Sequence, residues 1–256
     1  MLSYLYFIII GLAAGILVNY LADVLPAKRR LVAPICLFCG EGQNLLNYLF
    51  WPRRCEHCGN RRSLRTWVIE VLFIASTVWL GFSQPTEIGF FAGMILLIFF
   101  GVVVVIDLEH RLILNPVSLV GAFIGLMVGV NLHGLKSTLF GGIAGFCAML
   151  ILYYFGAVLM KWLAHRRGRV LDEEALGFGD VNLGGILGLL LGWPGILIGL
   201  MLTVLIAGIV SFIYLIFSLV MRRYRFDLAI PYGPFLISSA VALLFFRDFV
   251  IKHLGW

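Results

Sequence analysis

Long apolar runs, separated by short polar stretches, most constrain what this chain can fold into. A helix needs about 20 predominantly apolar residues to cross a bilayer. Hydrophobic residues make up 62% of the 256 residues and charged residues only 12%, which a soluble domain of this length could not hide from water. The sequence therefore predicts an all-α polytopic membrane protein with about eight transmembrane helices. The runs are Tyr4–Val24, Trp67–Phe82, Ile88–Ile106, Leu112–Val130, Leu135–Met160, Leu176–Leu191, Pro194–Val220 and Ala229–Val250.

The distribution of basic residues predicts the orientation of these helices. No basic residue precedes the first run, whereas three follow it at positions 28–30, the reverse of a secretory signal peptide. With the amino terminus outside, alternating loops place 16 of the 19 Lys and Arg residues in the cytoplasm, as the positive-inside rule expects. The net charge of +6 thus reports topology and gives little support to nucleic-acid binding. The three basic residues expected outside are Lys136, Arg247 and Lys252.

One sizeable polar segment, residues 26–66, follows the first transmembrane helix (residues 1–25) and precedes a transmembrane domain (residues 67–256). Its four cysteines have the spacing C-x2-C-x15-C-x2-C, which is typical of a zinc ribbon. Two disulfides are the alternative, but the topology puts this insert in the cytosol, where thiols stay reduced. We therefore expect a structural zinc ion bound by Cys36, Cys39, Cys55 and Cys58.

The insert also carries eight basic side chains against two acidic ones, Glu41 and Glu56. Contact with anionic lipid headgroups is the simplest interpretation of this charge. Docking of a ligand or of a substrate tail is the alternative. The fifth cysteine, Cys147, belongs to the fifth apolar run, where we expect it to be a small buried residue.

Two carboxylates are predicted at the cytosolic ends of different helices. Asp107 directly follows the apolar run Val102–Ile106, and Asp180 lies where the sixth run begins. A carboxylate at the mouth of a membrane helix is costly, so it is a functional candidate. The third helix ends inside and the sixth begins inside, so both carboxylates can lie at one depth. Two close aspartates share a proton, so one can activate water while the other protonates a leaving amine, as in an aspartic protease.

Each aspartate also has a simpler interpretation. An aspartate just before a helix often only caps its first turn, which applies to Asp180. Asp107 could be an ordinary interfacial residue that pairs with His110 or Arg111. The two aspartates therefore indicate a catalytic pair only if the fold brings them together.

Three further features surround the predicted pair. Gly177 and Gly179 flank Asp180 and would let an extended substrate come close, although glycine pairs are common in membrane helices. Glu70, about one turn into the second run, is expected to support the site. Its expected partner is Arg65 or Asn19.

These motifs, taken together, resemble a known family. The stretches CLFC, CEHC, VIDLEHRLILNPVS, LGFGDVNLGGILGLLLGW and IPYGPFL occur in the order found in the type IV prepilin peptidases, the GxGD-type aspartic proteases of the bacterial inner membrane. The resemblance covers nearly the whole chain. Residues in the amino-terminal segment and after the second cysteine pair fit as well: Asn19, Pro26, Ser63, Arg65 and Glu70.

The resemblance implies a bifunctional enzyme. Members cleave the short basic leader from prepilins and pseudopilins on the cytoplasmic side, after a glycine. They then methylate the new amino terminus with S-adenosylmethionine. Carried over by motif, the protease aspartates are Asp107 and Asp180. The four cysteines match the zinc-binding cytosolic segment that is linked to methyl transfer.

Three positions depart from the family pattern. Many members carry an LPD sequence after the first aspartate. This chain has Leu114 there, with Asn115 in the acidic position. Asn182 replaces a lysine that often follows GxGD. The segment between the cysteine pairs is shortened, which bears on methylation, whereas the first two changes are expected to tune the protease site.

Two other functions fit parts of the sequence. A presenilin-like GxGD intramembrane protease of broader specificity would use the same aspartates, but the cysteine insert argues against it. A transporter or scaffold could bind a cation with them. Transporters usually place such charges near the midplane of the bilayer, whereas these aspartates are expected at its boundary.

Overall fold

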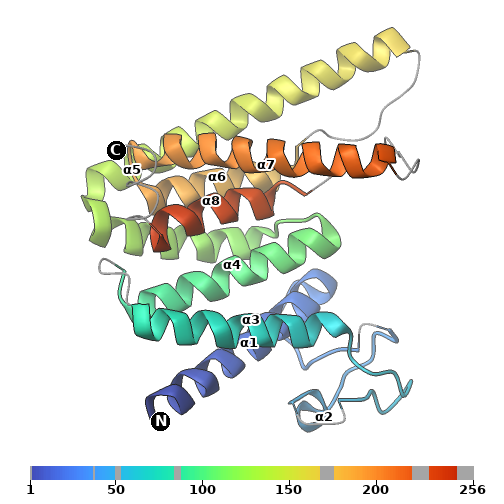
Figure 1. The fold of residues 1–256 in the computed structure, drawn as a ribbon. Coiled ribbons are helices and arrows are strands. Elements are labelled where there is room, and N and C mark those ends of the chain that lie inside the picture. Colours follow the sequence, from blue (N-terminus) through green and yellow to red (C-terminus); the bar gives the residue numbers. More distant parts are fainter. Residues whose placement is uncertain are drawn as a thin grey trace. The chain divides into compact units, whose positions relative to one another are not determined.

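The computed structural model describes residues 2–36, 38–49, 53–83, 88–167, 176–220 and 231–246. In these residues the regular structure is helical apart from two isolated β-bridges, which confirms the all-α prediction. Arg247, Lys252 and both ends of the eighth apolar run lie outside them. The helices (Figure 1) are α1 (Leu2–Lys28), α2 (Leu45–Leu49), α3 (Leu64–Ser83), α4 (Phe90–His110), α5 (Asn115–Arg167), α6 (Phe178–Leu191), α7 (Gly195–Val220) and α8 (Gly233–Phe245).

The apolar helices account for the eight predicted runs. Helices α1, α3, α4, α5 and α7 are long and apolar enough to cross a membrane, and α6 and α8 are shorter apolar helices. Helix α5 covers two runs because it bends at Gly134, whose φ of 76° and ψ of 162° are accessible to glycine. Figure 1 shows α5 turning back at this bend. We call residues 115–133 its first arm and residues 135–167 its second arm.

The chain divides into two compact units, residues 1–106 and 107–256. The division falls in the last turns of α4, so Asp107 is the first residue of the second unit. In the first unit, α1 packs closely against α3 because glycine faces that helix. A Cβ atom on Gly11 would lie 2.7 Å from the Cα of Ile74, and one on Gly15 would lie 2.8 Å from the Cα of Glu70. Small residues permit this approach of helix backbones inside a membrane.

Helix α6 packs against the second arm of α5 in the second unit. A Cβ atom on Gly188 would lie 2.2 Å from the carbonyl oxygen of Gly141, and one on Gly145 would lie 2.3 Å from that of Gly184. Helix α6 also contacts α7 and α8. These contacts position the first turn of α6, which carries Asp180, within the unit.

Candidate active site and metal-binding cluster

Asp107 lies in the last turn of α4 and is only 5% exposed. Its Oδ2 accepts a hydrogen bond of 3.0 Å from the backbone N–H of Gly233, the first residue of α8. Free N–H groups and the helix dipole make a helix amino terminus favourable for a carboxylate. A Cβ atom on Gly233 would lie 2.5 Å from this oxygen, so any larger residue here would displace the carboxylate. The start of α8 therefore holds the Asp107 carboxylate in place.

Asp180 lies in the first turn of α6 and is 8% exposed. Its side chain does not cap the helix, because the cap residue is Gly177 and no side-chain capping bond is present there. Its Oδ1 is buried and has no hydrogen-bond partner among the described residues. The capping interpretation therefore fails, and a buried carboxylate oxygen is left available.

The structure brings the two aspartates together. Asp107 and Asp180 lie close enough for their charges to interact. The charge of Arg111 also reaches Asp107, but the described residues form no ion pair between the two. Tyr232 lies close enough for the charge of Asp180 to act on its hydroxyl. Side chains from α4, α6 and the segment before α8 thus converge at one site.

The two expected glycines differ in what they contact. A Cβ atom on Gly179 would lie 2.7 Å from the Cβ of Ile113, so this glycine lets the segment after α4 pack on the first turn of α6. A Cβ atom on Gly177 would meet the Oδ2 of Asp180 at an ordinary 3.6 Å. Gly177 is also exposed, so the backbone beside Asp180 is open on that side.

The insert forms two similar cysteine turns. In each turn the carbonyl of the first cysteine accepts a hydrogen bond from the glycine that follows the second cysteine, at 2.8 Å for Gly40 and 2.9 Å for Gly59. These glycines have φ of 75° and 70°, in the left-handed region that favours glycine. The sequence C-x2-C-G thus builds the same turn twice.

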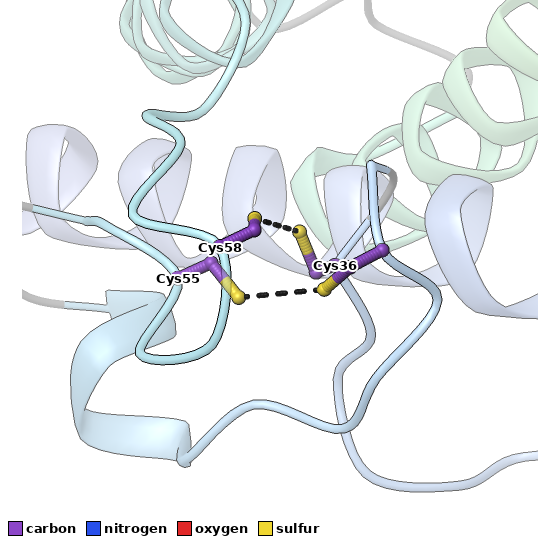
Figure 2. A group of neighbouring side chains, drawn as sticks. Cys36, Cys55 and Cys58 are labelled. Carbon is purple, nitrogen blue, oxygen red and sulfur yellow. Dashed lines mark hydrogen bonds between the residues drawn. The ribbon is translucent and has the colours of Figure 1, made fainter.

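The four thiols converge, as Figure 2 shows for three of them. The sulfur atoms lie 3.6 Å apart in the pairs Cys36–Cys58 and Cys39–Cys55, and all four lie within 4.8 Å of one another. Zn–S bonds of about 2.3 Å in a tetrahedron place sulfur atoms roughly 3.8 Å apart. The backbone N–H of Cys58 and the side chain of Gln43 lower the pKa of the Cys55 thiol to about 6, whereas the pKa of the Cys58 thiol is raised. This cluster can hold a metal ion.

Arginines on both sides of the second cysteine turn attach the insert to membrane helices. The Nη1 of Arg53 donates to both carboxylate oxygens of Glu70 on α3, at 2.8 and 2.9 Å. Arg62 donates to Asp23 on α1 at 2.6 Å and to the hydroxyl of Tyr48 at 2.7 Å. The carboxylates of Asp23 and Glu70 are buried. Their negative charges are compensated by Arg62 and Arg53 of the insert.

The partner of Glu70 therefore differs from the two that we expected. Arg65 forms an ion pair with Asp23, and the amide of Asn19 donates to the carbonyl of Thr66 at 3.2 Å. The reason is that the insert folds back and presents Arg53 to α3. Glu70 thus joins α3 to the insert, and Arg65 and Asn19 join α3 to α1. All three belong to the first unit, whereas Asp107 and Asp180 belong to the second.

Sequence reasoning missed Gly233 and Arg53, and it placed Asp23 near the cytosolic boundary without giving it a role. A signal for Gly233 was present, because Gly-Pro in IPYGPFL is a helix start in which proline occupies the first turn. No comparable signal marks Arg53, which is one of eight basic residues near the insert.

Comparisons with known proteins agree with the motifs. A profile of the Type IV leader peptidase family matches residues 94–216. A prepilin leader peptidase/N-methyltransferase of Burkholderia pseudomallei is 30% identical over 240 residues, which cover 88% of this chain and 71% of the relative. Proteins of the same name from Stutzerimonas stutzeri and Legionella pneumophila are 30% and 27% identical, over 84% and 83% of this chain and 70% of each relative. No solved structure gives a significant match.

Proposed function

Because the chain belongs to the type IV leader peptidase family, we propose that it cleaves the leader peptide of type IV prepilins and pseudopilins with an aspartate pair. The chain is a multi-pass membrane peptidase by its apolar helices and its relatives. The observation that carries the proposal is the convergence of Asp107 and Asp180 from separate helices at one buried site. Cleavage takes place at the cytoplasmic face of the bacterial inner membrane in this proposal.

The two carboxylates differ in their surroundings, which supports different roles in hydrolysis. The N–H of Gly233 orients the carboxylate of Asp107. Asp107 accepts a proton from a water molecule as the water oxygen attacks the scissile carbonyl carbon. Asp180, whose Oδ1 is buried and without a partner among the described residues, carries the shared proton. It gives this proton to the leaving amine nitrogen as the C–N bond breaks.

The orientation in the membrane is part of the same proposal. We place the amino terminus outside and both aspartates on the cytoplasmic side. The support is the charge distribution, which puts 16 of 19 basic residues inside. Prepilins and pseudopilins are the protein partners in this proposal, and the basic insert contacts anionic lipid headgroups.

We propose that the insert binds one structural zinc ion. Cys36, Cys39, Cys55 and Cys58 would hold it, and their sulfur spacing fits a tetrahedral site. A bound zinc ion cross-links the two cysteine turns. Metal binding would then supply much of the folding free energy of a segment this short.

Methylation of the new amino terminus is the second activity in the proposal, and its support is the name shared by the relatives. S-adenosylmethionine would be the methyl donor. The cavity beside Asp23, Cys36 and Arg62 has a volume of about 20 Å³, enough for a water molecule only. This cavity does not fit S-adenosylmethionine, so no step of methyl transfer is assigned to the residues around it.

One experiment tests both activities. The purified chain is incubated with a prepilin and S-adenosylmethionine, and the product is weighed by mass spectrometry. We expect the mass of the cleaved pilin plus one methyl group. Asp107→Asn and Asp180→Asn should abolish cleavage, whereas Glu109→Gln, at an exposed carboxylate in the same turn of α4, should not. Cleavage retained by Asp180→Asn contradicts the aspartate pair, and a cleaved but unmethylated product contradicts only the transferase.

A further inference from the structure

A groove runs along one face of the second unit, between α6 and the two arms of α5. Its volume is about 560 Å³. The residues that α6 contributes are Asn182, Gly185, Ile186 and Leu189, at the i, i+3, i+4 and i+7 spacing of one helix face. Cys147 lines this groove and is exposed, so the expectation that it is buried is wrong.

One end of the groove is polar and the rest is apolar. Asn115 and Ser118 from the start of α5 and Asn182 from the start of α6 form the polar end. Ser118 is 8% exposed, and its Oγ has no hydrogen-bond partner among the described residues. A buried hydroxyl without a partner is costly. The polar end of the groove therefore offers a hydrogen bond that a ligand can complete.

We propose that this groove binds the transmembrane helix of the substrate, with the amino-terminal end of that helix at the polar end. The proposal rests on the peptidase function proposed above. The first four N–H groups of a helix have no partner within the helix. Side-chain oxygens of Asn and Ser are preferred acceptors for such groups. Asn115, Ser118 and Asn182 thus match the chemistry of an incoming helix end.

Two properties of the groove favour a helix over a lipid. Among the described residues, those that line the groove include no charged side chain, whereas a lipid phosphate is best bound by basic residues. Ala122 is a small residue on the first arm of α5 that lines the groove. Such residues let helix backbones approach closely in a membrane.

The polar end of the groove lies at about the same level along α6 as Asp180. Asn182 follows Asp180 by two residues, so the polar end lies at the level of Asp180 but on the other side of α6. The peptide that precedes the bound helix then crosses the first turn of α6. Gly177 is exposed there and carries no side chain that would obstruct an extended chain. The scissile bond is thereby delivered from the groove to the pair of carboxylates.

Two substitutions test the groove through the kinetics of prepilin cleavage. Ser118→Ala should raise KM roughly 2- to 10-fold, the effect of one lost hydrogen bond. Because the hydroxyl has no partner within the described protein, the same substitution should leave the melting temperature unchanged or raise it. Ala122→Phe should fill the groove and raise KM at least as much. Gly208→Phe on α7, where a side chain meets open space, is the matched control and should keep the wild-type KM.

Photo-crosslinking identifies the occupant. The full chain carries the Asp180→Asn substitution, so that substrate stays uncleaved, and a photoreactive residue at Leu119 of the groove or at Phe212 of α7, both exposed. In membranes containing a prepilin, we expect a prepilin adduct from position 119 and none from position 212. Adducts to lipid or to a second copy alone, or wild-type KM values for both groove variants, overturn the inference. If the wild-type chain cleaves no prepilin, the proposed function itself fails.

Discussion

Replacing Gly233 with alanine is the sharpest test of how α8 holds Asp107. The new Cβ would lie 2.5 Å from the Oδ2 of Asp107 and 3.2 Å from its Cγ. Real Cβ contacts are essentially never shorter than 3.0 Å, so the carboxylate must move by at least 0.5 Å. That movement breaks or weakens the 3.0 Å bond from the backbone N–H of residue 233.

The expected loss can be estimated from this one bond. A hydrogen bond to a charged group contributes about 1.5–3 kcal/mol, and each 1.36 kcal/mol corresponds to a factor of ten in rate. The variant Gly233→Ala should therefore lower kcat for prepilin cleavage about 10- to 150-fold. The fold should survive, because the displaced group is the end of a flexible side chain.

The assay compares kcat, from the mass-spectrometric yield of cleaved pilin, with the melting temperature of the purified protein. Gly208→Ala is the matched control, since a methyl group there meets open space. We expect it to retain wild-type kcat. If Gly233→Ala keeps kcat within twofold of the wild type, the hydrogen bond from α8 does not position Asp107. A variant that loses its melting transition would show a role in folding instead.

Three more predictions concern the metal cluster and the packing of helices. Cys36→Ser should lower bound zinc from about one ion per chain to none, measured by plasma mass spectrometry; full zinc content in the variant would contradict a four-thiolate site. Glu70→Gln should cost about 3–5 kcal/mol because it leaves the buried Arg53 without its charged partner, and the double variant Arg53→Met/Glu70→Leu should melt higher than Glu70→Gln. Gly188→Leu should prevent α6 from packing on α5, so monodisperse folded protein in detergent would refute that close contact.

Features set by neighbouring residues could be predicted from the sequence. The two C-x2-C-G turns are local, because each closes through a backbone bond across four residues. The convergence of the two turns could be predicted because four thiolates coordinate one zinc ion as a tetrahedron. The spans also followed from the apolar runs, including the two runs that meet at the non-helical residue Gly134 within α5.

Features set by the path of the chain could not be predicted in the same way. The aspartates converge because α4 ends where α6 begins, which the topology indicated. The bond from Gly233 to Asp107 joins residues 126 positions apart, and the close approach of Gly233 to the carboxylate appears only once the helices are packed. The pairing of Arg53 with Glu70 likewise depends on how the insert folds back onto α3.

The shortness of α6 has a consequence for the surrounding bilayer. Its 14 residues reach only about 21 Å, whereas the hydrocarbon core is about 30 Å thick. The far end of α6 is fixed by Ser137, whose hydroxyl donates to the carbonyl of Trp193 just beyond the helix. The mismatch of about 9 Å must therefore be met by local thinning of the lipid or by a water-filled depression above Asp180. In the proposed peptidase, such a depression would bring water to the carboxylate of Asp180.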